Sequence, residues 1–314
     1  MTFLRAFSSV LTLGLLLSLP LPICAQSNVQ TINPTFTTID VPGAGFTAVL
    51  GVNTAGDMVG DYGQSTSQDV HGFKYSNGIF SYIDYPGAIS TVPTGINDSG
   101  LIVGYEGDSG NIHDKGFLYD GTTFTAVRVG QNTRTFIWGI DNAGDLPGGA
   151  GSANLTRAFV KQGGSFKPVN FPGSYSYAYA TGINNFGQIV GWTESGSVGD
   201  SYLYAQGKFK NIDVPGADAT LAFSINDSGV VVGYYQDVAQ FFAFALNKGK
   251  FLSFGYPGAV ATEAYGINDV GQVVGAYTFD YQTYHGFITS PITGADFANS
   301  PQGKLDVSHK KARR

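Results

Sequence analysis

An asparagine or aspartate recurs at six regularly spaced positions in this chain. Each copy follows a small residue and an Ile or Val, and a glycine stands three residues later. Brought together by a symmetric fold, the six oxygens could bind a cation or a sugar hydroxyl at the mouth of a channel. The same residues also suit turn capping, because Asn and Asp side chains accept hydrogen bonds from nearby backbone amides, and capping explains every copy equally well. The predicted channel-mouth ring comprises Asn53, Asn97, Asp141, Asn184, Asn226 and Asn268.

A second group of candidates is aromatic and lies in or beside the segments that vary most between the copies. These segments span residues 61–70, 106–114, 149–156, 193–200, 236–240 and 278–284. Loops on a rigid scaffold usually carry function, and aromatic faces beside amides suit carbohydrate or protein surfaces. The alternative is that these rings pack within the fold. The candidate ligand-binding residues are Tyr62, Tyr105, Trp138, Trp192, Tyr235, Tyr277 and Tyr281.

The acidic and histidine residues do not form a catalytic pattern. Asp40, Asp84 and Asp213 recur with the repeat, as do His71 and His285. A catalytic pair of carboxylates belongs instead to one unique cleft. We therefore predict no catalytic residue.

Metal-binding patterns are also incomplete. His113 lies off the repeat, but no serine partner can be recognised for it, and no histidine and acid spacing matches a zinc site. Asp108, Asn111 and Asp114 form an oxygen-rich segment without a full calcium-loop signature. We expect no metal and no cofactor, and calcium remains the alternative.

The candidates are positioned by a repeat of about 43 residues. Each copy contains a strand-like segment that starts with phenylalanine, then a G-I-N-type turn, an I-V-G strand and an H-G-F strand. The leading phenylalanines are Phe36, Phe80, Phe124, Phe166, Phe209 and Phe251. A glycine after each turn, as at Gly100, fits a tight hairpin that needs a left-handed residue.

Four short strands per copy predict an all-β, six-bladed β-propeller with four antiparallel strands per blade. Runs such as Val230–Tyr234 have no polar face, so both faces must be covered. The chain starts with the strand Phe36–Val41 and ends with the strand His285–Thr289, so we expect the N-terminal strand to complete the last blade. The G-I-N strand is then innermost. A solenoid is the alternative, although no capping repeats can be recognised.

The run from His71 through Gly95-Ile96-Asn97 to Gly104 resembles the HAF-type repeat of bacterial extracellular proteins. The resemblance covers residues 36–290. It implies export and a propeller-like repeat, and it implies no reaction, substrate or cofactor.

The two ends differ from the repeated body. Residues 1–25 carry Arg5, an apolar run and a small residue before Gln26, which predicts a signal peptide and secretion, with the periplasm as an alternative. Residues 26–35 are a lead-in, and residues 291–314 are predicted to be a disordered basic tail. The only cysteine, Cys24, lies in the predicted signal peptide, so closure cannot depend on disulfides.

The formal net charge of −6, with basic residues gathered in the tail, leaves an acidic body that argues against nucleic-acid binding. No run after the predicted signal peptide is long enough to span a membrane, and we expect a monomer.

The third copy departs most from the repeat, with Arg128, Pro147 and Trp138, through drift or because a groove lies there. We predict a non-enzymatic binding or scaffold protein for a glycan or protein surface; the alternative is a glycan-active hydrolase or lyase with its site at one channel mouth.

Overall fold

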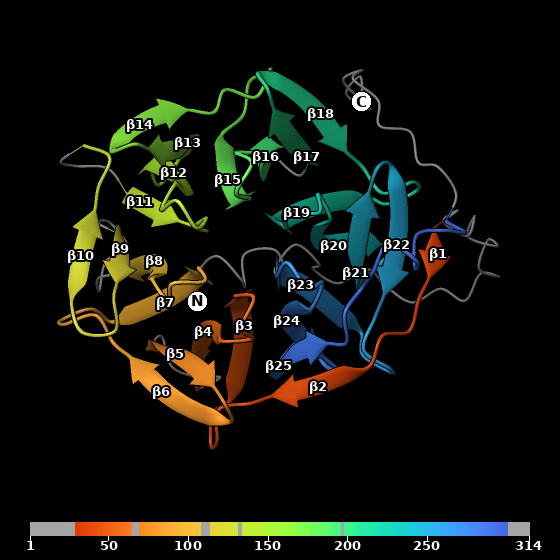
Figure 1. The fold of residues 1–314 in the computed structure, drawn as a ribbon, viewed down its shortest axis with the longest axis horizontal. Coiled ribbons are helices and arrows are strands. Elements are labelled where there is room, and N and C mark those ends of the chain that lie inside the picture. The colour runs from red at the N-terminus through yellow and green to blue at the C-terminus, as the bar shows by residue number, and fades with distance from the viewer. Residues whose placement is uncertain (1–28, 65–68, 108–113, 131–133, 196–197, 301–314) are drawn as a thin grey trace, which may run out of the picture.

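The computed structural model describes residues 29–64, 69–107, 114–130, 134–195 and 198–300. All regular elements in these ranges are β-strands (Figure 1). The predicted signal peptide, residues 1–25, lies outside the described residues, as do His113 and the basic residues 301–314.

The strands form antiparallel sets arranged around one axis (Figure 1), most of them made of four consecutive strands. One pair of sets is β3 (Phe46–Val52), β4 (Met58–Gly63), β5 (Val70–Ser76), β6 (Ile79–Ile83), then β7 (Ser90–Ile96), β8 (Ile102–Gly107), β9 (Lys115–Tyr119), β10 (Phe124–Val127). The next pair is β11 (Arg134–Ile137), β12 (Leu146–Ser152), β13 (Leu155–Gln162), β14 (Ser165–Pro168), then β15 (Tyr177–Ile183), β16 (Ile189–Ser195), β17 (Val198–Ala205), β18 (Lys208–Ile212). The last strands are β19 (Ala219–Ile225), β20 (Val231–Asp237), β21 (Gln240–Asn247), β22 (Lys250–Phe254), then β23 (Ala261–Ile267), β24 (Val273–Thr278), β25 (Tyr284–Thr289), with β2 (Phe36–Ile39) beside β25.

The first strand of each set lies nearest the axis (Figure 1). It is joined to the second strand by the predicted turn, whose glycine has a positive φ in every copy, between +70° and +87°. Glycine adopts this left-handed conformation without the steric cost that a side chain brings. The repeat of Asn and Gly in the sequence therefore sets the hairpin next to the axis.

Glycines also allow the inner strands to approach one another closely. A Cβ atom added to Gly51 would lie 2.9 Å from Cα of Gly95, and one added to Gly95 would lie 3.1 Å from Cα of Gly139. Backbone therefore packs against backbone at the centre. The pairing of β3, β7, β15, β19 and β23 with its neighbour is shifted by one residue just before this position, which is a β-bulge.

The third set departs from this pattern. Its inner strand β11 ends at Ile137, two residues before the axial Gly139, whereas β7 continues past Gly95 to Ile96. Pro147 in β12 accepts a hydrogen bond from the backbone N–H of Trp138 (3.1 Å) but has no N–H to return. The proline thus leaves the ladder between β11 and β12 without one hydrogen bond.

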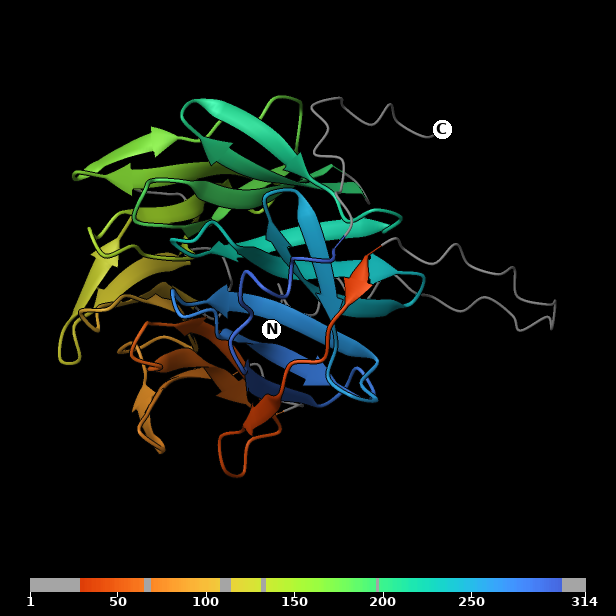
Figure 2. The same ribbon diagram turned by 45° about the vertical axis from the view of Figure 1, so that its right-hand side comes forward.

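Both ends of the described chain pack on the C-terminal strands. β2 pairs with β25 in the register Phe36 with Thr289, and β1 (Gln30–Thr31) pairs in parallel with the outer strand β22. Figure 2 shows this N-terminal segment running along the outside of the blue strands. The pairing of β1 was not foreseen in the sequence.

The predicted start of the disordered tail at residue 291 needs correction. Ile292 and Phe297 are buried in the apolar cluster around β22 and β25, and the Ser300 hydroxyl donates to the carbonyl of Phe251 (2.5 Å). The Lys250 ammonium donates to the carbonyls of Phe297 and Ala298 at 2.9 and 3.0 Å. Residues 291–300 therefore pack on the fold through Ile292 and Phe297. The basic residues further along the tail had suggested that the whole segment was polar.

Candidate ligand-binding site

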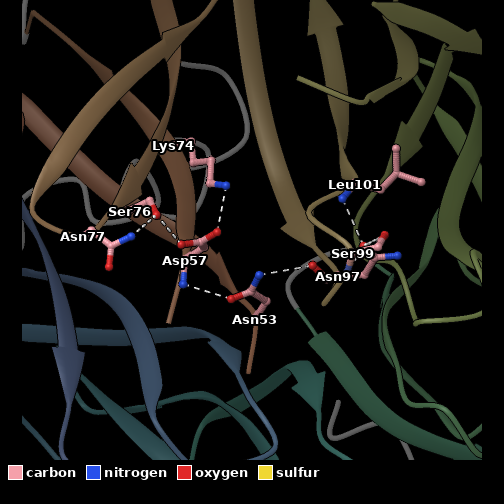
Figure 3. A network of polar contacts seen from close by, with 8 residues as sticks. All are labelled: Asn53, Asp57, Lys74, Ser76, Asn77, Asn97, Ser99 and Leu101. Atoms are coloured by element: carbon pink, nitrogen blue, oxygen red, sulfur yellow. Dashed lines mark hydrogen bonds and ion pairs between the residues drawn. The ribbon is translucent and has the colours of Figure 1, made fainter. Parts of the chain in front are cut away.

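The six recurring Asn and Asp residues lie together around the axis, at one end of the inner strands. Each of the five asparagine side chains does two things. The Oδ1 oxygen caps its own turn, as where the Asp57 N–H donates to Asn53 (2.9 Å), and the Nδ2 group donates to the main chain of the next copy, as from Asn53 to the Asn97 carbonyl (3.2 Å; Figure 3). Figure 3 also shows Lys74 paired with Asp57.

This amide ring runs around the axis with one gap. Asn97 donates to Asp141, Asn184 to Asn226, Asn226 to Asn268, and Asn268 back to Asn53, at 3.0–3.2 Å. Asp141 has no amide to donate, so the link from the third to the fourth set is missing. Burial raises the pKa of the Asp141 carboxyl.

A second ring lies one residue further along. The backbone N–H of one copy donates to the side chain of the next, from Thr54 to Asp98, Asp98 to Asn142, Asn142 to Asn185, Asn185 to Asp227, and Asp227 to Asp269, at 2.8–3.0 Å. The inner ring's side chains are buried and engaged in hydrogen bonds, so both rings act mainly to join the sets. Within the described residues, no cluster of His, Cys, Asp and Glu has the arrangement of a metal site.

An aromatic pocket lies in the same channel, beyond the axial glycines from the Asn ring. Its volume is about 60 Å³. One water molecule needs about 10–15 Å³, so the pocket accepts a group of a few heavy atoms. The lining residues are Leu50, Thr94, Tyr105, Trp138, Thr181, Trp192, Leu221, Phe223, Tyr234, Glu263 and Tyr265.

The bulges supply one layer of this lining. The extra residue before each axial glycine, or before Ser224 in the fifth copy, contributes its side chain to the pocket. Bulges are known to redirect side chains in this way. Five of these residues sit at observed register shifts, and Trp138 holds the equivalent place in the shortened β11 segment. The layer comprises Leu50, Thr94, Trp138, Thr181, Phe223 and Tyr265.

The second strands supply another layer through the residue that follows their conserved glycine. Tyr105, Trp192 and Tyr234 occupy this position in β8, β16 and β20. The structure thus brings together three of the seven predicted aromatic residues, Tyr105, Trp138 and Trp192.

The other four lie elsewhere. Tyr62, Tyr235 and Tyr277 stand one residue further along their strands and point to the opposite face, because successive strand residues alternate. Tyr62 packs on His71, and Tyr277 stacks on Tyr256 with ring centroids 3.6 Å apart.

Two of these tyrosines are tied to the fold by their hydroxyls. The Tyr235 hydroxyl bonds Ser253 (2.8 Å), and the Tyr281 hydroxyl donates to the Ala239 carbonyl (2.6 Å). These four tyrosines therefore support packing rather than the pocket.

Glu263 is the one carboxyl group in the pocket lining. It is buried and accepts a hydrogen bond from the Tyr265 hydroxyl. Burial raises the pKa of Glu263 to about 7, and the tyrosine hydrogen bond opposes that rise. Burial also raises the pKa of Tyr234 and Tyr265, so both remain neutral phenols.

Other buried acids lie outside the lining. Burial raises the pKa of Asp61 to about 7, whereas Glu106 pairs with Lys115 (2.7 Å) and Asp114 pairs with Arg134. The repeated histidines contact strand-end acids at the outer edge, His71 with Asp84 (2.9 Å) and His285 with Asp40 (2.8 Å).

No protein-family model matches the chain, and no curated protein sequence is similar to it. Among solved structures, one described as a putative gluconolactonase is similar, with a TM-score of 0.51, 11% identity, and coverage of 88% of this chain and 96% of that one. The all-β chain has a fold of the propeller type. Further similar structures are the β-propeller domain of the Trilobed protease from Pyrococcus furiosus (TM-score 0.48, 11% identity, coverage 82% and 96%) and YCF48 bound to D1 peptide (TM-score 0.48, 9% identity, coverage 84% and 100%).

The propeller's pocket includes residues that sequence reasoning missed. Glu263, Tyr265, Phe223 and Tyr234 lie in strands that the repeat marks as structural. The sequence did contain a signal for these pocket residues. The positions one and three places before the axial glycine differ from copy to copy, whereas the turn after it stays nearly the same. No helix in the described part of the propeller is long and apolar enough to cross a membrane.

Proposed function

We propose that this protein is a secreted, non-enzymatic binding propeller that holds its partner through the aromatic pocket. The observation that carries the proposal is the channel lining, where aromatic residues from several strand sets surround one buried carboxyl group. Pockets that are mostly apolar with a few convergent polar groups are typical ligand sites.

The geometry of the scaffold is part of the proposal. The strand sets would be the six blades of a closed propeller, with β2 completing the blade that contains β25, supported by their pairing. The HAF-type resemblance supports placing the chain among exported repeat proteins. We propose separately that the chain acts as a monomer without a cofactor. A small pocket suits a group that projects from a larger glycan or protein surface rather than a whole chain.

The test is a glycan and peptide array followed by calorimetry with the mature protein. Saturable binding without product release is expected, and Trp138→Ala should weaken it at least tenfold. Tyr82→Ala is the matched control, because Tyr82 is 57% exposed and lies outside the lining. Equal binding by the Trp138→Ala variant would contradict a partner in the pocket.

The second candidate is a glycan-active hydrolase or lyase with its site in the channel. The raised pKa of Glu263 favours it, since a general acid must keep its proton near neutral pH. Glycoside hydrolysis commonly needs a second carboxyl group facing the first, and Glu263 stands alone in the described lining. Product release that is lost in Glu263→Gln would decide for the enzyme.

A further inference from the structure

Glu263 occupies a position where the repeat otherwise places uncharged side chains. The equivalent residues, three places before the axial glycine or Ser224, are Ala48, Val92, Phe136, Tyr179 and Leu221. A carboxyl group buried there costs free energy unless it is paired. The fold therefore does not require an acid at this place.

No basic side chain among the described residues forms an ion pair with Glu263. Its contacts are phenolic: Tyr265 donates to it, and its negative charge contributes to raising the pKa of Tyr234 and Tyr281. Among the described lining residues, Glu263 thus supplies the one negative charge when it is ionised, and none of them is basic. Asp61, Asp114 and Arg134 lie outside the lining but act electrostatically on Tyr105.

Two of the three ring contacts beside Glu263 are perpendicular, and the third, between Phe223 and Tyr234, is parallel (19°, centroids 5.5 Å apart). Tyr265 lies edge-on to Phe223 (82°, centroids 5.2 Å apart) and to Tyr234 (90°, centroids 6.3 Å apart). Trp138 and Trp192 line the same pocket. Several aromatic rings around one small space bind quaternary ammonium groups when their faces attract the cation through cation–π interactions.

We propose that the pocket binds an alkylammonium group, with Phe223, Tyr234, Tyr265 and the two tryptophans as its walls and Glu263 as its counter-ion. This inference rests on the proposed binding function and names the group that enters the pocket. The same methylated ammonium chemistry occurs in a free quaternary amine such as choline and in a trimethylated lysine side chain. The pocket's volume of about 60 Å³, room for several water molecules, is enough for such a head group.

The binding should depend on pH in one direction. A cation binds the ionised form of Glu263, whose pKa is about 7 in the free protein. Affinity should therefore be highest above pH 7 and fall about tenfold per unit below it. Tyr234 and Tyr265 in the lining, and Tyr281 outside it but within electrostatic range of Glu263, have raised pKa values and stay neutral over this range. Asp61, whose pKa burial also raises to about 7, lies outside the lining and acts electrostatically on Tyr105.

The test is calorimetric titration of the mature protein with tetramethylammonium and choline, and with 3,3-dimethylbutanol as the uncharged isostere of choline. We expect saturable binding of both cations, at least tenfold weaker binding of the isostere, and at least tenfold weaker choline binding in Glu263→Gln. Asp84→Asn removes the same charge from a side chain that is 55% exposed and should leave the affinity unchanged. Trimethyl-lysine and unmodified lysine peptides then distinguish a protein source from a free amine.

Equal affinity for choline and its isostere, or for wild type and Glu263→Gln, would overturn the inference. So would the absence of cation binding in a protein that still binds an array partner through Trp138, a result that leaves the proposed function standing. If neither cations nor any array partner bind, both proposals fail. Circular-dichroism melts of each variant show whether it is folded, and competition of choline with an array partner tests the site without any mutation.

Discussion

Glu263 lowers the stability of the fold at neutral pH because its carboxyl group is buried. Its carboxyl group lies among tyrosine, phenylalanine and leucine side chains in the channel, and burial raises its pKa from 4.5 to about 7. The acid ionises less readily in the folded protein than in the unfolded chain. Its contribution to the free energy of unfolding therefore falls as pH rises from about 4.5 to about 7, and stays low above that.

Replacing Glu263 by Gln should remove this pH-dependent penalty. The shift corresponds to on the order of 3 kcal/mol at about 1.4 kcal/mol per pKa unit. We expect Glu263→Gln to gain stability relative to wild type between pH 5 and pH 8, up to that amount. Urea unfolding at the two pH values measures the gain, and Asp84→Asn should show none. A difference between the two pH values below about 0.5 kcal/mol would contradict the buried, unpaired state of the acid.

Asp141 is the second residue whose chemistry differs from that of its repeat equivalents, which are all asparagines. The amide ring lacks its link from the third to the fourth set because an aspartate cannot donate to Asn184. Asp141→Asn supplies the missing donor and removes a carboxyl group whose pKa burial has raised. We expect an increase of about 0.5–1.5 kcal/mol in the free energy of unfolding.

The reverse change provides the check. Asn226→Asp opens a second gap in the ring and should lower stability by a similar amount or more, measured by urea unfolding at pH 7. Stabilisation by Asn226→Asp, or no effect of either variant, would mean that the ring does not join the sets energetically.

At the scale of the elements, the inner strands combine two functions in adjacent residues. The axial glycine lets neighbouring backbones touch, and the bulged residue before it enters the pocket. Gly51→Ala places a methyl group 2.9 Å from Cα of Gly95 and should cost about 1–3 kcal/mol. Gly294→Ala is the control, since nothing lies within 4 Å there. Equal melting temperatures for the two variants would show that the inner strands can move apart.

The same elements explain what the sequence could predict. The hairpins, the axial glycines and the Asn positions repeat at regular spacing, with Ser224 and Asp141 as exceptions, so their spacing alone located them. Tyr62 and Tyr105 looked equivalent, yet Tyr62 lies one residue further from its glycine and so faces the other way. Counting from Gly60 and Gly104 would have separated them.

Other parts of the site required the pairing of strands. The bulge that aims Tyr265 at the channel depends on the register of β23 against β24, which no local pattern reveals. Glu263 was missed because it lies within a strand that otherwise repeats as core. Ile292 and Phe297 were missed because the basic residues nearby suggested a polar tail throughout.

In the whole molecule, strand pairing and hydrogen bonds join the N-terminal strands to the C-terminal ones. β2 pairs with β25, the Asp40 carboxylate contacts His285, and Asn268 donates to Asn53 across the same junction. A chain that starts at Ala44 lacks β2 and leaves β25 as an open edge. We expect it to melt at least 10 °C lower, or to aggregate.

A chain that starts at Pro34 is the matched control. It loses β1 but keeps β2, and should melt within a few degrees of the full mature chain in circular dichroism. Size-exclusion chromatography reports aggregation. If both truncations behave alike, the ends do not close the fold.

A partner held in the channel pocket would change the environment of the tryptophans there. The chain's two tryptophans, Trp138 and Trp192, both line that pocket. Titration of the mature protein with choline at pH 8, followed by tryptophan fluorescence, should give a saturable change whose midpoint matches the calorimetric affinity. Binding detected by calorimetry with no change in tryptophan emission would contradict the account.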